Sequence, residues 1–258
     1  MFLFRCLFLT YFDFSLAYFA GKYIHYVNVL CPFGIRKMTY DEKLLALLDV
    51  VIDTYITKGE PIGSKFLHSQ GDLEYAPSTL RKYLHVLEQQ GMVYQPYNSS
   101  GRIPTVQGLT LYIEHFLAQQ EQDTLDEIVG ARDNMKNLVE TLGAIADGVV
   151  VGFLKNDEYY YLGINNLLKD DMIDEYQTTR SIIRFIEDKT LVKFLDGKML
   201  KKNQIYYTFI EDSDIMISCL YVKILIGGYD GVISIIGPTR VNYKQNAAIM
   251  KKLLASFL

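Results

Sequence analysis

Apolar residues recur every three to four positions in three consecutive segments, which polar residues separate. In segment 41–58 they form a wide stripe, which is typical of an amphipathic helix, and Gly59 marks its end. A shorter helix is predicted at about 65–69, with Ser64 in position to cap it. A third helix is predicted from Pro77, because proline suits the first helical turn, where a missing N–H costs no hydrogen bond.

The third helix has one apolar and one polar face. Leu80, Leu84 and Leu87 share the apolar face, and Gly91 follows at the position where a helix ends. The opposite face carries side chains that can donate hydrogen bonds: Ser78, Arg81, Lys82, His85 and Gln89.

After this helix the pattern changes to that of a β-hairpin. Residues 92–94 predict a short strand, 97–101 a polar turn, and Arg102 leads into a second strand. Three helices followed by a two-stranded wing make a winged helix-turn-helix, so we assign residues 38–104 to a domain that binds double-stranded DNA. Arginine can bridge guanine O6 and N7, and Ser or Thr at a helix N-terminus can hold phosphates. The alternative interpretation is an ordinary solvent-exposed surface, which carries the same residue types. The candidate DNA contacts are Lys65, Ser78, Thr79, Arg81, Lys82, His85, Ser99, Ser100 and Arg102.

The rest of the chain predicts a helical segment and a β-rich body. Segment 105–147 keeps helical spacing, with Thr105 in position to cap its first helix, and we expect it to be a linker that packs on a second copy of the protein. Residues 148–258 predict two strands, helices at 167–176 and 178–197, three more strands and a final helix. This order indicates an antiparallel sheet with helices against it, so the predicted fold class is mixed α/β of the α+β type.

Residues 1–37 differ from the rest because Phe, Tyr and Leu crowd them. Arg5 and Asp13 interrupt the apolar run, and each is costly inside a bilayer. Three interpretations are open: the true start is Met38 or the leader is disordered, the segment forms an extra helix on the body, or it anchors the chain in a membrane. We favour the first and expect no membrane association.

Composition, charge and the absence of known motifs exclude several classes of function. The net charge of −4, with more acids than bases in 38–120, argues against non-specific coating of nucleic acid but allows a local basic patch. The three scattered cysteines predict no disulfide framework, which suits a reducing cytoplasm. The sequence contains no nucleophile elbow, phosphate loop or zinc-protease motif, and none of its four histidines has the spacing of a metal ligand. We therefore expect neither an enzyme nor a cofactor or metal.

Three strings add a resemblance to a known family. TKGEPIGSK, PSTLRKYLHVLEQQGMVYQPYNSSGRIPT and GVISIIGPTRVNY occur in the order found in the heat-inducible transcription repressor HrcA, and the resemblance runs from about Met38 to the end. It matches Ser64 and Lys65 to the second-helix signature, which adds Ser64 to the candidate DNA contacts. Thr79 and Arg81 match the start of the family's recognition helix. Lys82-Tyr83 stands where the family usually has Asn-Asp.

The resemblance implies a winged helix joined to a GAF-like domain, and a homodimer that represses chaperone operons by binding the CIRCE inverted repeat. It also implies that the chaperonin GroEL keeps the repressor active and that heat stress relieves repression. The family's inserted dimerisation segment is reduced or missing after Gly148. Arg240, in the C-terminal GPTR signature, has two interpretations: it binds a ligand anion, or it bonds main-chain carbonyls and ties the last strand to the body.

Two other functions are compatible with the same pattern. A winged-helix regulator that responds to a small ligand would control other operons. A winged helix can also serve as a protein-interaction module, which would not bind an inverted repeat.

Overall fold

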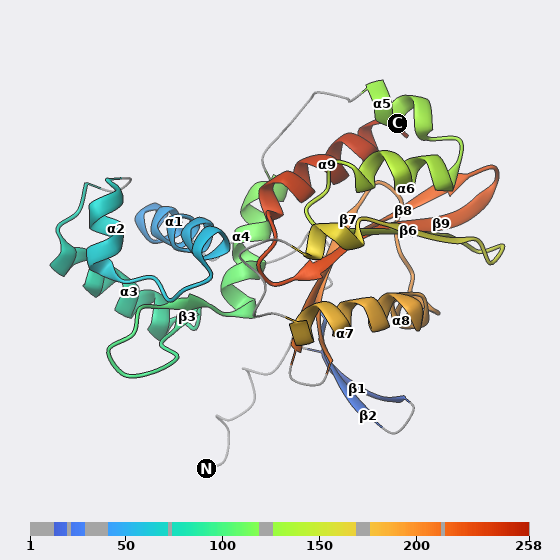
Figure 1. The fold of residues 1–258 in the computed structure, drawn as a ribbon. Helices are drawn as coiled ribbons and strands as arrows, with labels where there is room; N and C mark the ends of the chain where they lie inside the picture. The colour runs from blue at the N-terminus through green and yellow to red at the C-terminus, as the bar shows by residue number, and fades with distance from the viewer. Residues whose placement is uncertain are drawn as a thin grey trace, which may run out of the picture. The chain divides into compact units, whose positions relative to one another are not determined.

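A computed structural model of the chain describes residues 13–19, 22–28, 41–71, 74–118, 126–168, 176–212 and 215–257 (Figure 1). The chain divides into two compact units, which we call the helical unit and the sheet unit. The helical unit comprises Pro32–Gln120 and Arg240–Ala247, and the sheet unit comprises Met1–Cys31, Glu121–Thr239 and Ala248–Leu258.

The helical unit has the order of elements that the sequence predicts. Its elements are α1 (Glu42–Lys58), α2 (Ser64–Gln70), α3 (Pro77–Gln89), β3 (Val93–Tyr94), β4 (Ile103–Pro104) and α4 (Val106–Ala118). Leu47, Leu48, Val51 and Ile52 of α1 are at most 1% exposed, as is Leu80 of α3. The apolar stripes of the predicted helices therefore build one core.

Capping groups explain where these helices begin and end. The Asp41 side chain accepts a hydrogen bond from the Lys43 N–H at 3.0 Å, and Gly59, with φ of 71°, donates its N–H to the Tyr55 carbonyl. Thr105 caps α4, since its Oγ1 accepts from the Gly108 N–H at 3.1 Å. The predicted cap of α2 is wrong: Gly63 is the N-cap, and Ser64 is the first helical residue, with its side chain buried.

The sheet unit is built on an antiparallel sheet. Its strand order is β1-β2-β7-β8-β9-β5-β6, in which β1 (Asp13–Phe19) and β2 (Lys22–Asn28) form a hairpin that pairs with β7. The other strands are β5 (Val149–Leu154), β6 (Tyr159–Leu162), β7 (Ile205–Asp212), β8 (Ile215–Ile226) and β9 (Tyr229–Pro238). Its helices are α5 (Asp126–Ala131), α6 (Met135–Gly143), η1 (Ile164–Leu167), α7 (Tyr176–Glu187) and α8 (Thr190–Leu195), and α9 (Tyr243–Ala255) starts in the helical unit and ends here.

Helices cover both faces of this sheet (Figure 1). On one face, Met135 and Val139 of α6 lie against Gly152 of β5. On the other face, Ile182 and Ile186 of α7 join a buried core that includes the sheet residue Val151. The unit is thus a mixed α+β fold with an antiparallel sheet, as predicted.

Three details differ from the sequence prediction. The apolar face of α6 packs on its own sheet, with Leu138 and Leu142 fully buried, so this face is not available to a second copy. The helix predicted at 178–197 is two helices, because Lys189 adopts the left-handed conformation between them. Part of 1–37 forms strands β1 and β2 instead of the helix that was one alternative.

Some predicted features lie outside the described residues. They include most of the helix predicted at 167–176 and the remainder of segment 1–37. Among the described residues, no helix has both the length and the apolar character needed to cross a bilayer.

Candidate nucleic-acid interface

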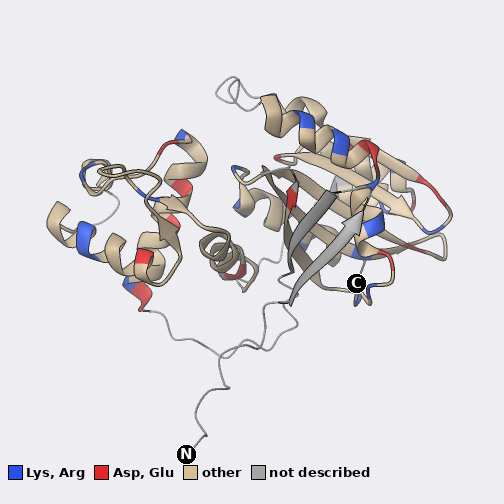
Figure 2. Cartoon of the chain, turned by 90° about the horizontal axis from the view of Figure 1, so that it is seen from below, with Lys and Arg blue, Asp and Glu red and all other residues tan. Residues whose placement is uncertain are grey.

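The outer face of α3 presents most of the predicted DNA-binding side chains to solvent. Ser78, Arg81, Lys82 and His85 are exposed, and Thr79 is half-buried. Lys65 on α2 is exposed as well. Basic and acidic residues are interspersed along the helices of both units, so any patch that attracts DNA is local (Figure 2).

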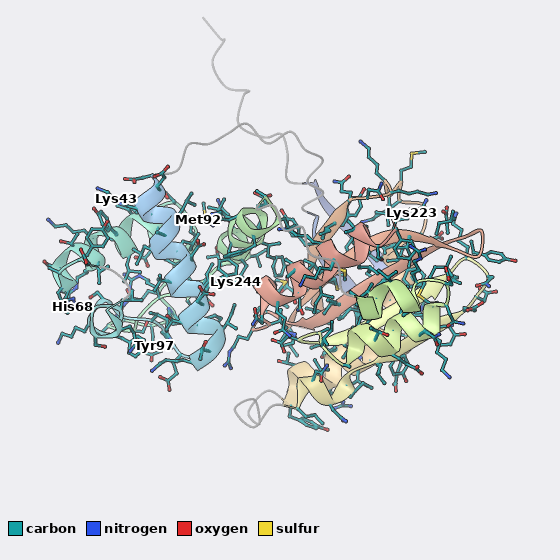
Figure 3. The ribbon with its side chains drawn as sticks, turned by 90° about the horizontal axis from the view of Figure 1, so that it is seen from above. Lys43, His68, Met92, Tyr97, Lys223 and Lys244 are labelled. Atoms are coloured by element: carbon teal, nitrogen blue, oxygen red, sulfur yellow. The ribbon has the colours of Figure 1, made fainter. Side chains whose placement is uncertain are left out.

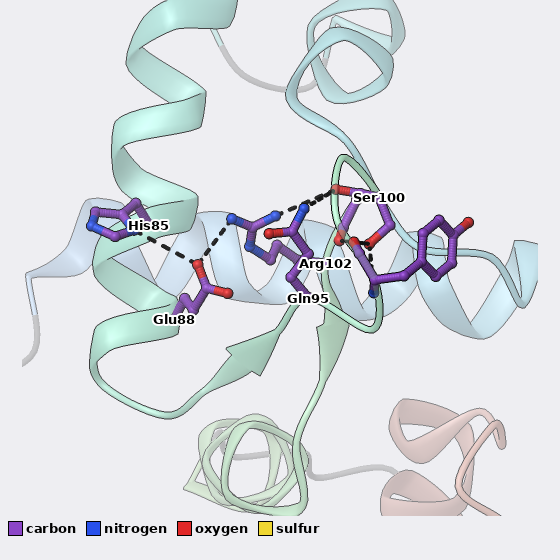
Figure 4. Close-up of polar contacts among 7 residues, drawn as sticks. His85, Glu88, Gln95, Ser100 and Arg102 are labelled. Carbon is purple, nitrogen blue, oxygen red and sulfur yellow. Dashed lines mark hydrogen bonds and ion pairs between the residues drawn. The ribbon is translucent and has the colours of Figure 1, made fainter.

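Arg102 lies between the end of the hairpin loop and α3, and its guanidinium is held there (Figure 4). Its Nη2 donates to Glu88 Oε2 at 2.9 Å and its Nη1 donates to the Ser100 carbonyl at 3.4 Å. The Arg102 side chain is only 17% exposed. His85 Nδ1 lies 3.7 Å from the same Glu88 oxygen. The structure therefore places Arg102 against a carboxylate of its own chain, although the sequence predicts a DNA contact for it.

Side chains shape the loop 95–101 from within. The Ser100 hydroxyl donates to the Tyr97 carbonyl at 2.7 Å, and Gln95 Nε2 donates to the Ser100 carbonyl at 3.0 Å. Ser99 is exposed and adopts a left-handed conformation, with φ of 66°. Tyr97, at the periphery of the helical unit (Figure 3), is 66% exposed. Ser100 thus builds the loop, while Ser99 and Tyr97 are presented by it.

A two-residue bridge connects this loop to the segment before α2. The Ile62 N–H donates to the Arg102 carbonyl and the Arg102 N–H donates to the Ile62 carbonyl, both at 2.8 Å. Gly101 allows this approach, because a Cβ on it would lie 2.4 Å from the Ile62 carbonyl carbon. Ser64, two residues further on, is 7% exposed, so its predicted contact with DNA is not supported by its position.

Sequence reasoning missed Glu88, Gln95 and Tyr97. Glu88 is the one acid on a helix face of donors, which was a signal that it pairs with a nearby cation. Tyr83, one of the two departures from the family pattern, packs edge-on against Tyr75 with ring centroids 5.4 Å apart. Of those two departures, Lys82 is the exposed one.

Within the helical unit, the segment 240–247 packs on α1 and α4. Arg240 Nη2 donates to the Ile56 carbonyl in the last turn of α1 at 3.3 Å. Lys244 Nζ donates to Asp53 Oδ2 at 2.6 Å, and the Tyr112 hydroxyl donates to the other oxygen of Asp53. Burial, followed by this hydrogen bond, raises the pKa of Tyr112. The contact of Arg240 favours its structural interpretation over anion binding.

Among the described residues, no group of three or more His, Cys, Asp or Glu side chains is arranged to hold a metal ion. Cys219 of β8 is a free thiol in the sheet core, where burial raises its pKa. A buried thiol of this kind is unreactive.

Comparisons with known proteins place these features in a family. Residues 105–246 match the family model described as HrcA protein C terminal domain. A heat-inducible transcription repressor HrcA from Ruminiclostridium cellulolyticum is 26% identical over 161 residues, which is 60% of this chain and 46% of the relative. The repressor of the same name from Lachnoclostridium phytofermentans is 26% identical over 192 residues, 69% of this chain and 54% of the relative.

A shorter match to the HrcA repressor of Alkaliphilus metalliredigens reaches 41% identity over 80 residues, 31% of this chain and 23% of the relative. The chain thus spans about half the length, or less, of these relatives. They are named as transcription repressors and not as enzymes, in agreement with the sequence prediction. A crystal structure of a hypothetical protein, with 15% identity and a TM-score of 0.61 over 84% of this chain and 96% of that one, has a similar fold.

Proposed function

The chain belongs to the HrcA family, and on that basis we propose that it represses chaperone operons by binding the CIRCE inverted repeat as a homodimer. The observation that carries this proposal is the exposed polar and basic face of α3, next to a loop that its own side chains hold in shape.

In this proposal the helical unit is a winged helix-turn-helix. The helix α3 enters the major groove, and Arg81 reads a guanine edge. Ser78 and Thr79 at the start of α3 hold a phosphate through their hydroxyl groups. Lys65, Lys82, His85 and Ser99 complete the surface that meets DNA, and the loop lies along the backbone.

The sheet unit is proposed to contain a GAF-like domain. A dimer sets two recognition helices one or more turns apart, which suits an inverted repeat. GroEL maintains the active form, and heat lowers the active fraction through a population shift. The protein acts in the cytoplasm.

Fluorescence anisotropy with a CIRCE duplex and a scrambled duplex of equal composition tests the proposal. We expect specific binding that is tighter by a factor on the order of 10³ or more, falling as salt rises. Equal affinity for both duplexes at low salt would contradict a CIRCE repressor. No binding to either duplex would favour a protein-interaction module.

A further inference from the structure

The Arg102 guanidinium already has a partner of opposite charge. Its Nη2 lies 2.9 Å from Glu88 Oε2, and the two side chains are 17% and 29% exposed. A phosphate that bound Arg102 would have to displace Glu88 or lie beside its negative charge. Displacement would break the ion pair, and a phosphate beside Glu88 would be repelled by a like charge, so both alternatives cost free energy.

We propose that Arg102 and Glu88 form a positioning pair, which fixes the loop 95–101 relative to the DNA-facing side of α3, and that Arg102 does not itself contact DNA. This inference rests on the proposed function, and it assigns Glu88 a role in DNA binding although its charge has the wrong sign for a DNA contact.

Three sets of contacts converge on the pair. Arg102 Nη1 and Gln95 Nε2 both donate to the Ser100 carbonyl, which fixes the loop to the guanidinium. The backbone of Arg102 is bridged to Ile62, which fixes the base of the loop. His85 approaches Glu88 from the same face of α3, so the carboxylate joins the DNA-facing helix surface to the loop (Figure 4).

The pair determines where the exposed tip of the loop meets the DNA backbone. A displacement of about 1 Å in a binding surface is enough to weaken the contacts that it makes. Loss of either partner should therefore weaken DNA binding, whichever charge is removed.

The test compares three variants: Arg102→Ala, Glu88→Ala and a double variant in which the two residues are exchanged (Glu88→Arg together with Arg102→Glu). Their binding to the CIRCE duplex is measured by anisotropy across a salt series. A positioning pair predicts that both single variants lose affinity on the order of tenfold, that the salt slope stays within error of the wild type, and that the exchange recovers most of the loss. A phosphate contact predicts the reverse for Glu88→Ala, because removing an acid near DNA tightens binding. It also predicts a slope for Arg102→Ala smaller by about 0.9, and no recovery on exchange.

Hydrogen exchange of the segment 92–105 separates this inference from the proposed function. The single variants should exchange faster there and the exchanged pair should be protected again, with or without DNA. If the wild type does not discriminate CIRCE, the proposed function fails, and the exchange data still decide whether the pair fixes the loop. Unchanged protection, or faster exchange with unchanged DNA affinity, would overturn the inference.

Two further variants control for folding. Glu88→Gln keeps a hydrogen-bond acceptor for Arg102, so it should bind DNA within about threefold of the wild type if position is what matters. Tightened binding by Glu88→Gln would instead indicate relief of charge repulsion and would contradict positioning. Arg184→Ala removes an exposed ion pair of the sheet unit, between Arg184 of α7 and Asp188 just after it, and should leave DNA affinity unchanged.

Discussion

Gly101 offers the most direct test of how the hairpin is built. A Cβ at this position would lie 2.4 Å from the carbonyl carbon of Ile62, 2.5 Å from its nitrogen and 2.5 Å from the carbonyl carbon of Pro61. Non-bonded carbon atoms are most stable at about 3.5–4.0 Å. All three neighbours belong to the backbone, so no side chain can rotate away. Gly101→Ala must therefore move the hairpin away from the segment that precedes α2.

The two hydrogen bonds between Ile62 and Arg102 set the size of the effect. Both are 2.8 Å long and would break or lengthen as the two segments separate. Each backbone hydrogen bond contributes about 0.5–1.5 kcal/mol net, so Gly101→Ala should cost roughly 1–3 kcal/mol in local stability. That cost corresponds to amide exchange about 5 to 150 times faster at these two residues.

Residue-resolved hydrogen exchange measures this at the Ile62 and Arg102 amides. Gly130→Ala is the matched control, because its Cβ would meet nothing within 4 Å and the residue lies exposed in α5. In that helix, alanine should stabilise by about 0.5–1 kcal/mol. If Gly101→Ala leaves both amides as protected as in the wild type, the argument from close backbone approach is wrong.

Three other variants test separate parts of the chain. Arg81→Ala should weaken binding to the CIRCE duplex by about 1–3 kcal/mol and reduce its discrimination from a scrambled duplex, measured by anisotropy. Arg240→Ala removes the donor to the Ile56 carbonyl and should lower the free energy of unfolding by about 1 kcal/mol in urea titration. Asp230→Asn should be less stable than the wild type at pH 7, and the difference should vanish in acid. The hydrogen bond from Lys223 lowers the pKa of Asp230, so this carboxylate stabilises the fold above its unfolded pKa and ceases to do so as pH falls through its folded pKa.

Local patterns were sufficient for most elements of the helical unit. Residues close together in the sequence determine the apolar period of α1 and α3 and the end of α1 at Gly59, and the structure confirms these predictions. The predicted cap at Ser64 failed because Gly63 takes the extended conformation and Ser64 turns into the core. The break between α7 and α8 was not predicted, because the residue that adopts the left-handed conformation there is Lys189 and not a glycine, and no proline marks the position.

Contacts between distant segments were beyond any local pattern. Arg240 and Ile56 are 184 residues apart, and Lys244 and Asp53 are 191 apart. The sequence placed the GPTR signature at the end of the β-rich body, whereas Arg240–Ala247 belongs to the helical unit. A helix period or a strand alternation describes which face is buried but not which partner buries it.

The strings that identify the family are largely the ones that build the hairpin. In SGRIPT, Gly101 permits the close approach, Arg102 pairs with Glu88, and Thr105 both caps α4 and donates to the Gly91 carbonyl at 2.6 Å. Ile62 of GEPIGSK supplies the other half of the backbone bridge.

The exposed residues of α3 are a separate matter, because they carry the proposed reading of bases. Tyr83 departs from the family pattern but is half-buried and packs on Tyr75, so Lys82 is the exposed departure on the proposed DNA-binding face. A lysine that replaces a side-chain amide exchanges a directional pair of hydrogen bonds for a point charge. The proposed repressor should therefore keep the family's geometry on the DNA backbone while losing base discrimination at the position that faces Lys82.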